Sequence, residues 1–282
     1  MDITYIALII FIVITYVYYS IPAIGKIHFT LEALKNNSLQ ETTKKNYSRL
    51  GIYILAIVVS QFAINSMYLI NKCGGGAGQN IGTAAVLTFF PWIFIFGIMC
   101  VFLIMYPYFK TAFSDVIGYF AIAGKANKIL TSILIDVEAE ESINNTSMSD
   151  QDKMTMKKAA DALLKLCGNK SVIINKMTPF NFLDIWNMLV PLMREKGNIP
   201  DIGNIQKELY DLVITKDNIG ESIWYIYTAV LIVSIISYNM STKSCKKSLD
   251  QIKADHDKYL EDEKKIEEQK ALNNSTPMVI SG

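Results

Sequence analysis

Hydrophobic residues lie along this chain in long blocks separated by polar segments, and not at the short regular spacing of a soluble core. The longest block, residues 83–109, contains no charged residue and exceeds the roughly 20 residues that a helix needs to cross a bilayer. Three further blocks, within residues 1–20, 51–71 and 219–240, have the same character. The pattern predicts an all-α, multi-span transmembrane protein with about four spans.

Polar segments separate and follow these blocks. They comprise a basic loop at 21–50, a glycine-rich loop at 72–82, a region at 110–218 and a charged tail at 241–282. The glycine-rich loop lacks the Gly-Lys-Ser/Thr ending of a phosphate-binding loop, so we interpret it as a plain turn. The region at 110–218 has the length of a small extramembrane domain.

Within that region the local signals are helical. Good helix formers predict a helix over 154–167, Pro179 predicts the start of a second, and a third is expected over 205–214. The acidic and polar stretch at 136–147 is typical of a solvated connection. We therefore expect a small helical domain over 110–218.

The distribution of positive charge gives conflicting indications of topology. Basic residues concentrate in cytoplasmic loops, which places the 21–50 loop in the cytoplasm. Four crossings then put the 110–218 domain on the cytoplasmic side and the tail on the far side. The lysines directly after the last span instead favour the cytoplasmic side for the tail. Either one segment re-enters or lies along the interface, or the membrane is not an ordinary one. The residues concerned are Lys26, Lys35, Lys44, Lys45 and Arg49 in the loop and Lys243, Lys246 and Lys247 in the tail.

The overall charge and the rarity of histidine exclude several function classes. With 27 basic and 26 acidic residues, the chain has no basic excess to recommend a nucleic-acid partner. Its two histidines, His28 and His256, are linked by no local motif to a nucleophile. The acids Asp150 and Asp152 are interpreted as helix-start residues and not as metal ligands. We expect no enzyme activity, no cofactor and no metal.

The four cysteines lie far apart in the sequence. Their spacing matches neither a zinc site nor a disulfide framework, and no Cys-x-x-Cys pair occurs. We therefore expect unpaired thiols. The residues are Cys73, Cys100, Cys167 and Cys245.

Polar residues inside the spans are candidates for function, because burying an unpaired polar group costs on the order of 1–3 kcal/mol. Gln61 and Asn65 are four residues apart and share one face of the second span. They could face an aqueous path, but hydrogen bonding between helices is the favoured interpretation, since no charge accompanies them. Glu221, at a span boundary, is expected to form an ion pair at headgroup level and not to act as a gate.

Aromatic residues crowd the ends of the spans. Amphipathic rings prefer the headgroup level of a bilayer, so these residues are interpreted as membrane-interface anchors. The anchors are Tyr18, Tyr19, Tyr106, Tyr108, Trp224 and Tyr225.

The tail carries a narrow apolar stripe on a charged helix. Ile252, Tyr259 and Ile266 recur every seven residues, but the companion positions are mostly polar. This pattern is typical of a helix that docks on a partner, and not of a strong coiled coil.

Several segments carry a resemblance to a known family. The segment 109–120, FKTAFSDVIGYF, and the segment 125–130 follow a span directly; the segment 216–225, KDNIGESIWY, precedes the last one, and 237–239 with Cys245 lie at its far end. Read together, they resemble a membrane protein family of the nucleocytoplasmic large DNA viruses, which are icosahedral giant viruses of algae and amoebae.

The resemblance implies a minor capsid protein of the virion. Such a protein would lie in the internal viral membrane beneath the capsid and would anchor that bilayer to the shell, with capsid proteins and other viral membrane proteins as partners. The resemblance carries over no active-site residue. From the residues alone, the alternative is a small channel or transporter with a polar path along the second span, which would require a homo-oligomer.

Overall fold

The computed structural model describes residues 3–73, 77–134, 169–190, 193, 201–243, 245 and 249–274. Within these ranges the protein is helical and contains no strand, which confirms the all-α prediction. The helix expected over 154–167, the connection at 136–147 and the acid pair near 150 lie outside the described residues.

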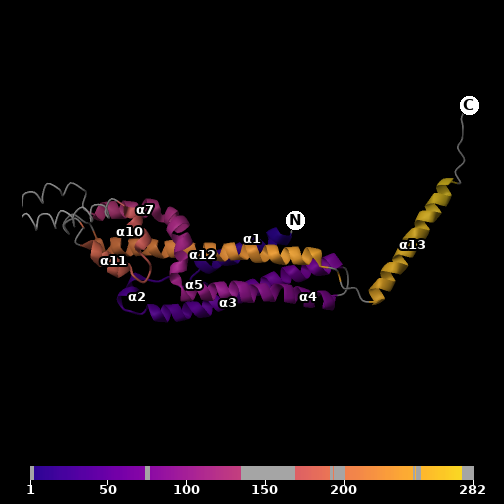
Figure 1. The fold of residues 1–282 in the computed structure, drawn as a ribbon, viewed down its shortest axis with the longest axis horizontal. Coiled ribbons are helices and arrows are strands. Elements are labelled where there is room, and N and C mark those ends of the chain that lie inside the picture. Colours follow the sequence, from indigo (N-terminus) through magenta and orange to yellow (C-terminus); the bar gives the residue numbers. More distant parts are fainter. Residues whose placement is uncertain are drawn as a thin grey trace, which may run out of the picture.

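Four helices are long and apolar enough to cross a membrane, as predicted. They lie side by side and alternate in direction, so that the start of the first lies beside the end of the last (Figure 1). The Thr4 and Ser237 hydroxyls, 2.8 Å apart, mark one end of this bundle. The spans are α1 (Ile3–Ser20); α3 (Leu39–Cys73); α4 (Ala77–Phe90) continued by η1 (Pro91–Phe96) and α5 (Gly97–Met105); and α12 (Ile202–Thr242).

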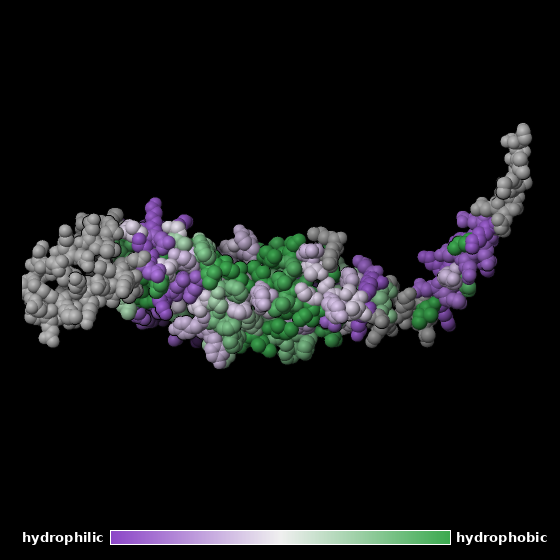
Figure 2. Space-filling model, turned by 45° about the horizontal axis from the view of Figure 1, so that its top comes forward, coloured by the Kyte–Doolittle hydropathy of each residue, from purple (hydrophilic) through white to green (hydrophobic). Residues whose placement is uncertain are grey.

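The bundle has an apolar interior and an apolar exterior. Phe11, Ile57, Trp92, Phe96 and Ile232 are completely buried between the helices. Between 22% and 39% of each apolar window is buried, and the rest is partly or fully exposed, which is the arrangement of helices solvated by lipid. Figure 2 shows hydrophobic side chains gathered around the middle of the elongated molecule, with hydrophilic ones toward both ends.

The second, third and fourth spans have bounds that differ from the expected ones. The second helix begins at Leu39, so the latter part of the expected basic loop is helical. The third begins at Ala77, so residues 77–82, which were expected in the glycine-rich turn, are helical. The third ends at Met105 and not at 109, because Pro107, which has no backbone N–H to donate, opens the short 3-10 helix η2 (Pro107–Lys110). The lipid-crossing helix therefore stops before the first lysine after the span.

The fourth span is not separate from the extramembrane domain. The helix expected over 205–214 and the span expected over 219–240 form a single helix of 41 residues, α12. No proline interrupts the stretch. Gly220 lies inside the helix, and its missing side chain leaves room for a close neighbour, as described below. The domain and the membrane anchor share one rigid element.

The helical domain packs around the first half of α12. It comprises α7 (Tyr119–Ile133), α10 (Lys170–Lys176) and α11 (Phe182–Leu189), with Ile133 and Leu209 among its completely buried residues. The second helix expected in this region begins at Phe182 and not at Pro179. Asn181 accepts a hydrogen bond from the Thr178 backbone N–H, and this turn occupies the residues that were expected to start the helix.

Short elements connect the bundle to the domain. The helix α2 (Leu31–Lys35) lies in the basic loop, and α6 (Thr111–Phe113) and η3 (Ser114–Gly118) lead from the third span into α7. The tail forms α13 (Leu249–Asn274), which lies apart from the bundle (Figure 1). The domain and the tail thus leave the bundle at opposite ends.

A disulfide joins Cys73 to Cys245, with their Cα atoms 5.2 Å apart, and the expectation of unpaired thiols is wrong for this pair. The two cysteines are 172 residues apart in sequence, so their spacing gave no indication of the bond. The antiparallel bundle brings the ends of α3 and α12 together, and this contact pairs them. Cys100 is free and buried.

Candidate functional site

Two segments far apart in the sequence, 107–120 and 216–225, pack against each other where the bundle meets the helical domain. We call these two segments the junction. Lys110 Nζ lies 2.7 Å from Asp217 Oδ2, and the rings of Phe109 and Trp224 stack with their centroids 4.5 Å apart. The two longest sequence segments that carry the viral resemblance are therefore two sides of one contact.

Glycines allow the two segments of the junction to approach closely. A Cβ atom on Gly118 would lie 2.5 Å from the backbone oxygen of Lys216. On the other side, a Cβ atom on Gly220 would lie 2.6 Å from Cβ of Ser114. Because real Cβ contacts are longer, each backbone occupies space that only glycine leaves open.

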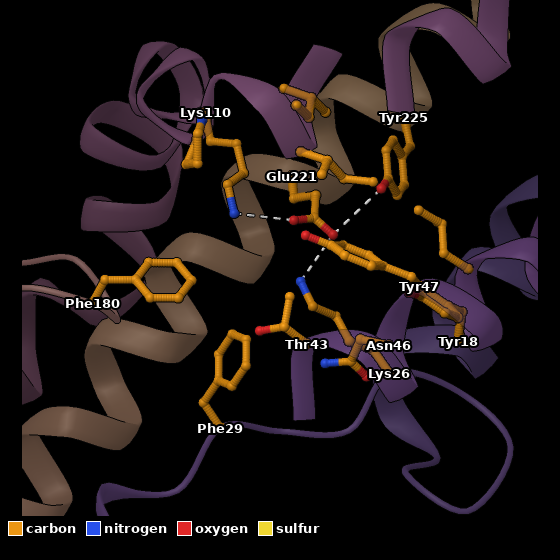
Figure 3. Close-up of a pocket in the computed structure, with 14 residues that line it drawn as sticks. Tyr18, Lys26, Phe29, Thr43, Asn46, Tyr47, Lys110, Phe180, Glu221 and Tyr225 are labelled. Carbon is orange, nitrogen blue, oxygen red and sulfur yellow. Dashed lines mark hydrogen bonds and ion pairs between the residues drawn. The ribbon is translucent and has the colours of Figure 1, made fainter. Parts of the chain in front are cut away.

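A buried charge cluster lies beside this contact (Figure 3). Lys26 Nζ donates to Glu221 Oε1 at 2.9 Å, and Lys110 Nζ donates to Glu221 Oε2 at 3.1 Å. The Tyr19 hydroxyl also donates to Glu221 Oε1, at 2.8 Å. We call Lys26, Lys110, Asp217 and Glu221 the junction cluster. Two cations and two carboxylates make it neutral, which is the condition under which charges tolerate burial.

The electrostatics of Lys110 follow from this pairing. Burial by itself lowers the pKa of a lysine, but the Glu221 and Asp217 carboxylates outweigh burial and hold the pKa of Lys110 above its ordinary value. Lys110 therefore stays charged throughout the physiological pH range. Its charge fixes η2 against α12.

A second ion pair joins the buried Lys216 to the partly exposed Asp115. Lys216 is 2% exposed, and its ammonium lies 2.9 Å from Asp115 Oδ1. The same ammonium donates to the backbone oxygens of Ile174 and Asn175 at the end of α10. Lys216 therefore connects three elements, η3, α10 and α12, and completes the attachment of the domain to the bundle.

A cavity of about 100 Å³ opens beside the junction cluster. Its walls come from the basic loop, from the first turns of α3, from the end of α5 and from the domain (Figure 3). The lining includes Lys26, Thr43, Asn46, Leu103, Lys110 and Phe180. Asn46 accepts from the Ile27 backbone N–H and donates to the Ile27 carbonyl, which holds the basic loop over the cavity.

The sequence predicted an ion pair at Glu221 but not its partners. Glu221 is 9% exposed and pairs with two lysines, so the expected ion pair is present, and it is buried within the protein. Sequence reasoning did not select Lys26 or Lys110 as partners. The available signal was the four-residue spacing of Asp217 and Glu221, which puts two carboxylates on one helix face beside an apolar span.

Only part of the aromatic set faces outward. Tyr106 and Tyr108 are 54% and 75% exposed, which suits interface anchors. Tyr18 and Tyr225 are 5% and 2% exposed, so their assignment as anchors is wrong. They lie on the bundle side of their helices, and Tyr18 stacks on the ring of Tyr53 with centroids 4.4 Å apart.

The remaining two predicted anchors are half-buried and take part in the junction. Tyr19 donates to Glu221, as described above. Trp224 donates from Nε1 to the Phe109 backbone oxygen at 3.2 Å. Both polar tips bind protein groups.

The polar pair of the second span makes contacts between helices. Gln61 Nε2 donates to the Ala7 carbonyl of α1 at 2.8 Å, and Asn65 Nδ2 donates to the Thr88 hydroxyl of α4 at 2.8 Å. Both amides are buried, and the space beside them is about 10 Å³, close to the minimum that holds one water. The pair links α3 to its neighbours.

The apolar stripe of the tail is exposed on α13. Ile252, Tyr259 and Ile266 are 51%, 64% and 52% exposed. The helix carries acids and lysines around this stripe, including the exposed pair of Lys265 and Glu261. The stripe therefore has the accessibility that docking would require.

Within the described ranges, no group of three or more His, Cys, Asp or Glu side chains could hold a metal ion. No protein-family model, curated protein or solved structure matches this chain. Within the junction the charges are paired and the backbones are in direct contact.

Proposed function

We propose that this chain is a structural membrane protein that anchors a bilayer to a protein layer. Following the sequence resemblance, we propose that the bilayer is the internal membrane of an icosahedral large DNA virus and that the layer is its capsid. The observation that carries the proposal is α12, one helix of 41 residues that belongs to both the domain and the membrane bundle. Force applied to the domain would pass directly into the membrane anchor.

The junction supports this role because it prevents the domain from hinging on the bundle. Separating η2 and α12 would take the buried Lys110 away from both of its carboxylate partners, Asp217 and Glu221, which is strongly unfavourable. Separating η3 and α12 would do the same to Lys216. A tether benefits from such a joint, whereas a transporter needs elements that move.

The domain and the tail cannot both reach the same layer, because they leave the bundle at opposite ends (Figure 1). We propose that the domain faces the capsid and that α13 faces partners on the other side of the membrane. This refines the sequence-based expectation, in which both regions contact capsid proteins.

Cross-linking in the native particle or membrane tests the tether. Exposed lysines of the domain, among them Lys125 and Lys207, should cross-link to capsid proteins, while Lys258 of the tail should cross-link to a different set. Mass spectrometry of the linked peptides identifies both sets. Links only between copies of this chain, in a membrane without a shell, would contradict the tether and make ion flux the next measurement.

A channel along α3 has less support. Gln61 and Asn65 are engaged by α1 and α4 of the same chain, and they face little free space. An aqueous path would have to break these hydrogen bonds. The tether therefore remains the better proposal.

The disulfide orients the proposed tether. Disulfides persist in oxidising compartments, so the end of the bundle with Cys73 and Cys245 belongs on the extracytoplasmic side. The 21–50 loop and the domain then lie in the cytoplasm, in agreement with the basic residues of that loop. For the orientation of the bundle, the disulfide and the basic loop together outweigh the lysines after the fourth span. No re-entrant segment is then needed to explain those lysines.

Side-specific labelling tests this orientation. In sealed vesicles, a cysteine introduced by Lys125→Cys in the domain and one introduced by Lys258→Cys in the tail should react with a membrane-impermeant maleimide from opposite faces. The unsubstituted chain, measured before and after reduction, supplies the background from its own cysteines. Reaction of both variants from the same face would overturn the four-crossing arrangement.

A further inference from the structure

We propose that the cavity beside the junction cluster binds the phosphate of an anionic phospholipid whose acyl chains lie against α3 and α5. The membrane side of this cavity is apolar, with Leu50 and Leu103 in its lining, and the domain side carries Lys26 and Lys110 with Glu221 between them. This order, apolar and then cationic, matches the order of acyl chain and phosphate in a lipid. Basic pockets between spans at the cytoplasmic surface are the usual sites of anionic headgroups.

The two ammonium groups retain donors for a ligand. Each has three protons; Lys26 gives one to Glu221, and Lys110 gives one each to Asp217 and Glu221. Among the described residues this leaves two protons on Lys26 and one on Lys110 without an acceptor. Lysine binds phosphate as a point charge, so no further alignment is required.

The size and rim of the cavity fit this ligand. One water needs roughly 10–15 Å³ of such space, so about 100 Å³ admits several groups of that size and has room for a phosphate. The rim is formed by amphipathic and apolar residues: Tyr47, Ile104 and Phe180 are 48%, 36% and 52% exposed. A lipid phosphate could enter here while its chains remain outside, between α3 and α5.

The surrounding charge favours a membrane lipid over a free anion. The junction cluster is neutral, but Lys44 and Arg49 lie on the same stretch of α3 as the cavity wall. Arg49 bonds the backbone oxygens of Pro22 and Gly25 and brings positive charge to the base of the loop. Basic residues next to a span attract anionic lipid surfaces, and the apolar residues of the rim suit acyl chains, which a soluble phosphate lacks.

Native mass spectrometry of the full chain tests the proposal, after incorporation into nanodiscs of phosphatidylglycerol and phosphatidylcholine and release into detergent. The key variant is Thr43→Leu, which fills the cavity without touching an ion pair, since Thr43 bonds only the Leu39 carbonyl of its own helix. Thr42→Leu makes the same change at the neighbouring residue, which is not part of the lining. Melting temperatures verify that both variants are folded.

We expect one phosphatidylglycerol to be retained per chain in the unsubstituted protein and in Thr42→Leu, and its occupancy to fall at least about fivefold in Thr43→Leu. A diacylglycerol, which lacks the phosphate, should not be retained. Equal retention by all three proteins, or equal retention of diacylglycerol, would overturn the proposal. If inorganic phosphate binds the lipid-free chain and Thr43→Leu abolishes that binding, the ligand is a free anion and not a lipid. These readouts are independent of capsid partners, so they can fail while the tether stands.

Discussion

Replacing Glu221 by glutamine should lower the melting temperature of the full chain in detergent by on the order of 10 °C. The substitution keeps the shape of the side chain but removes the negative charge between Lys26 and Lys110, which are 9% and 7% exposed. Removing one partner of a buried ion pair costs about 3–5 kcal/mol, because the remaining charge is left unpaired. Asp217 continues to pair with Lys110, so the loss falls mainly on Lys26.

The chain offers a matched control in Glu41→Gln. Glu41 pairs with Lys45 at 2.8 Å on the same membrane face of the protein, but both side chains are more than 60% exposed. Exposed pairs contribute little to stability, so this variant should have the same melting temperature as the unsubstituted protein. If Glu221→Gln and Glu41→Gln melted at the same temperature, the junction cluster would not be the buried, stabilising element described above.

The second large effect is expected from Gly118→Ala. Its new methyl group would lie 2.5 Å from the Lys216 carbonyl oxygen, which belongs to the α12 backbone and cannot rotate away. Overpacking of this kind costs about 1–3 kcal/mol, and here it would push η3 away from α12 and strain the ion pair of Lys216 and Asp115. We expect a lower melting temperature and faster proteolysis between the bundle and the domain.

Gly124→Ala, six residues further along, should raise the melting temperature. Nothing lies within 4 Å of a Cβ atom at that position, which is an exposed site of α7. There the substitution should stabilise the helix by roughly 0.5–1 kcal/mol, because alanine loses less backbone freedom than glycine. A rise in melting temperature for both glycine variants would show that η3 and α12 do not meet as closely as described.

At the junction, the sequence identified the segments and their charges but not the pairing between them. The segments 109–120 and 216–225 were singled out by resemblance, and their charges are visible in the sequence. That Lys110 pairs with Asp217, and Asp115 with Lys216, depends on the crossing of two helical segments more than a hundred residues apart. Local patterns carry no information on such a crossing.

The aromatic residues illustrate a related limit. Tyr108 and Tyr225 both lie at the ends of apolar blocks, so composition gives them the same interpretation. One is exposed and the other is buried against its neighbours in the bundle. The direction of a side chain at a span boundary depends on how the helix is rotated in the bundle, and an all-round apolar helix gives no periodic signal for that rotation.

The sequence by itself determined that this is an all-α protein with four membrane-crossing helices, because the length and apolarity that a bilayer demands are properties of single segments. It also determined where the charged tail helix lies, since a helical stripe is a local pattern. The tertiary structure alone decided the disulfide of Cys73 and Cys245, the continuity of α12 with the domain, and the burial of Glu221 between two lysines. These features arise from contacts between residues distant in sequence, and only the packing of the folded chain brings such residues together.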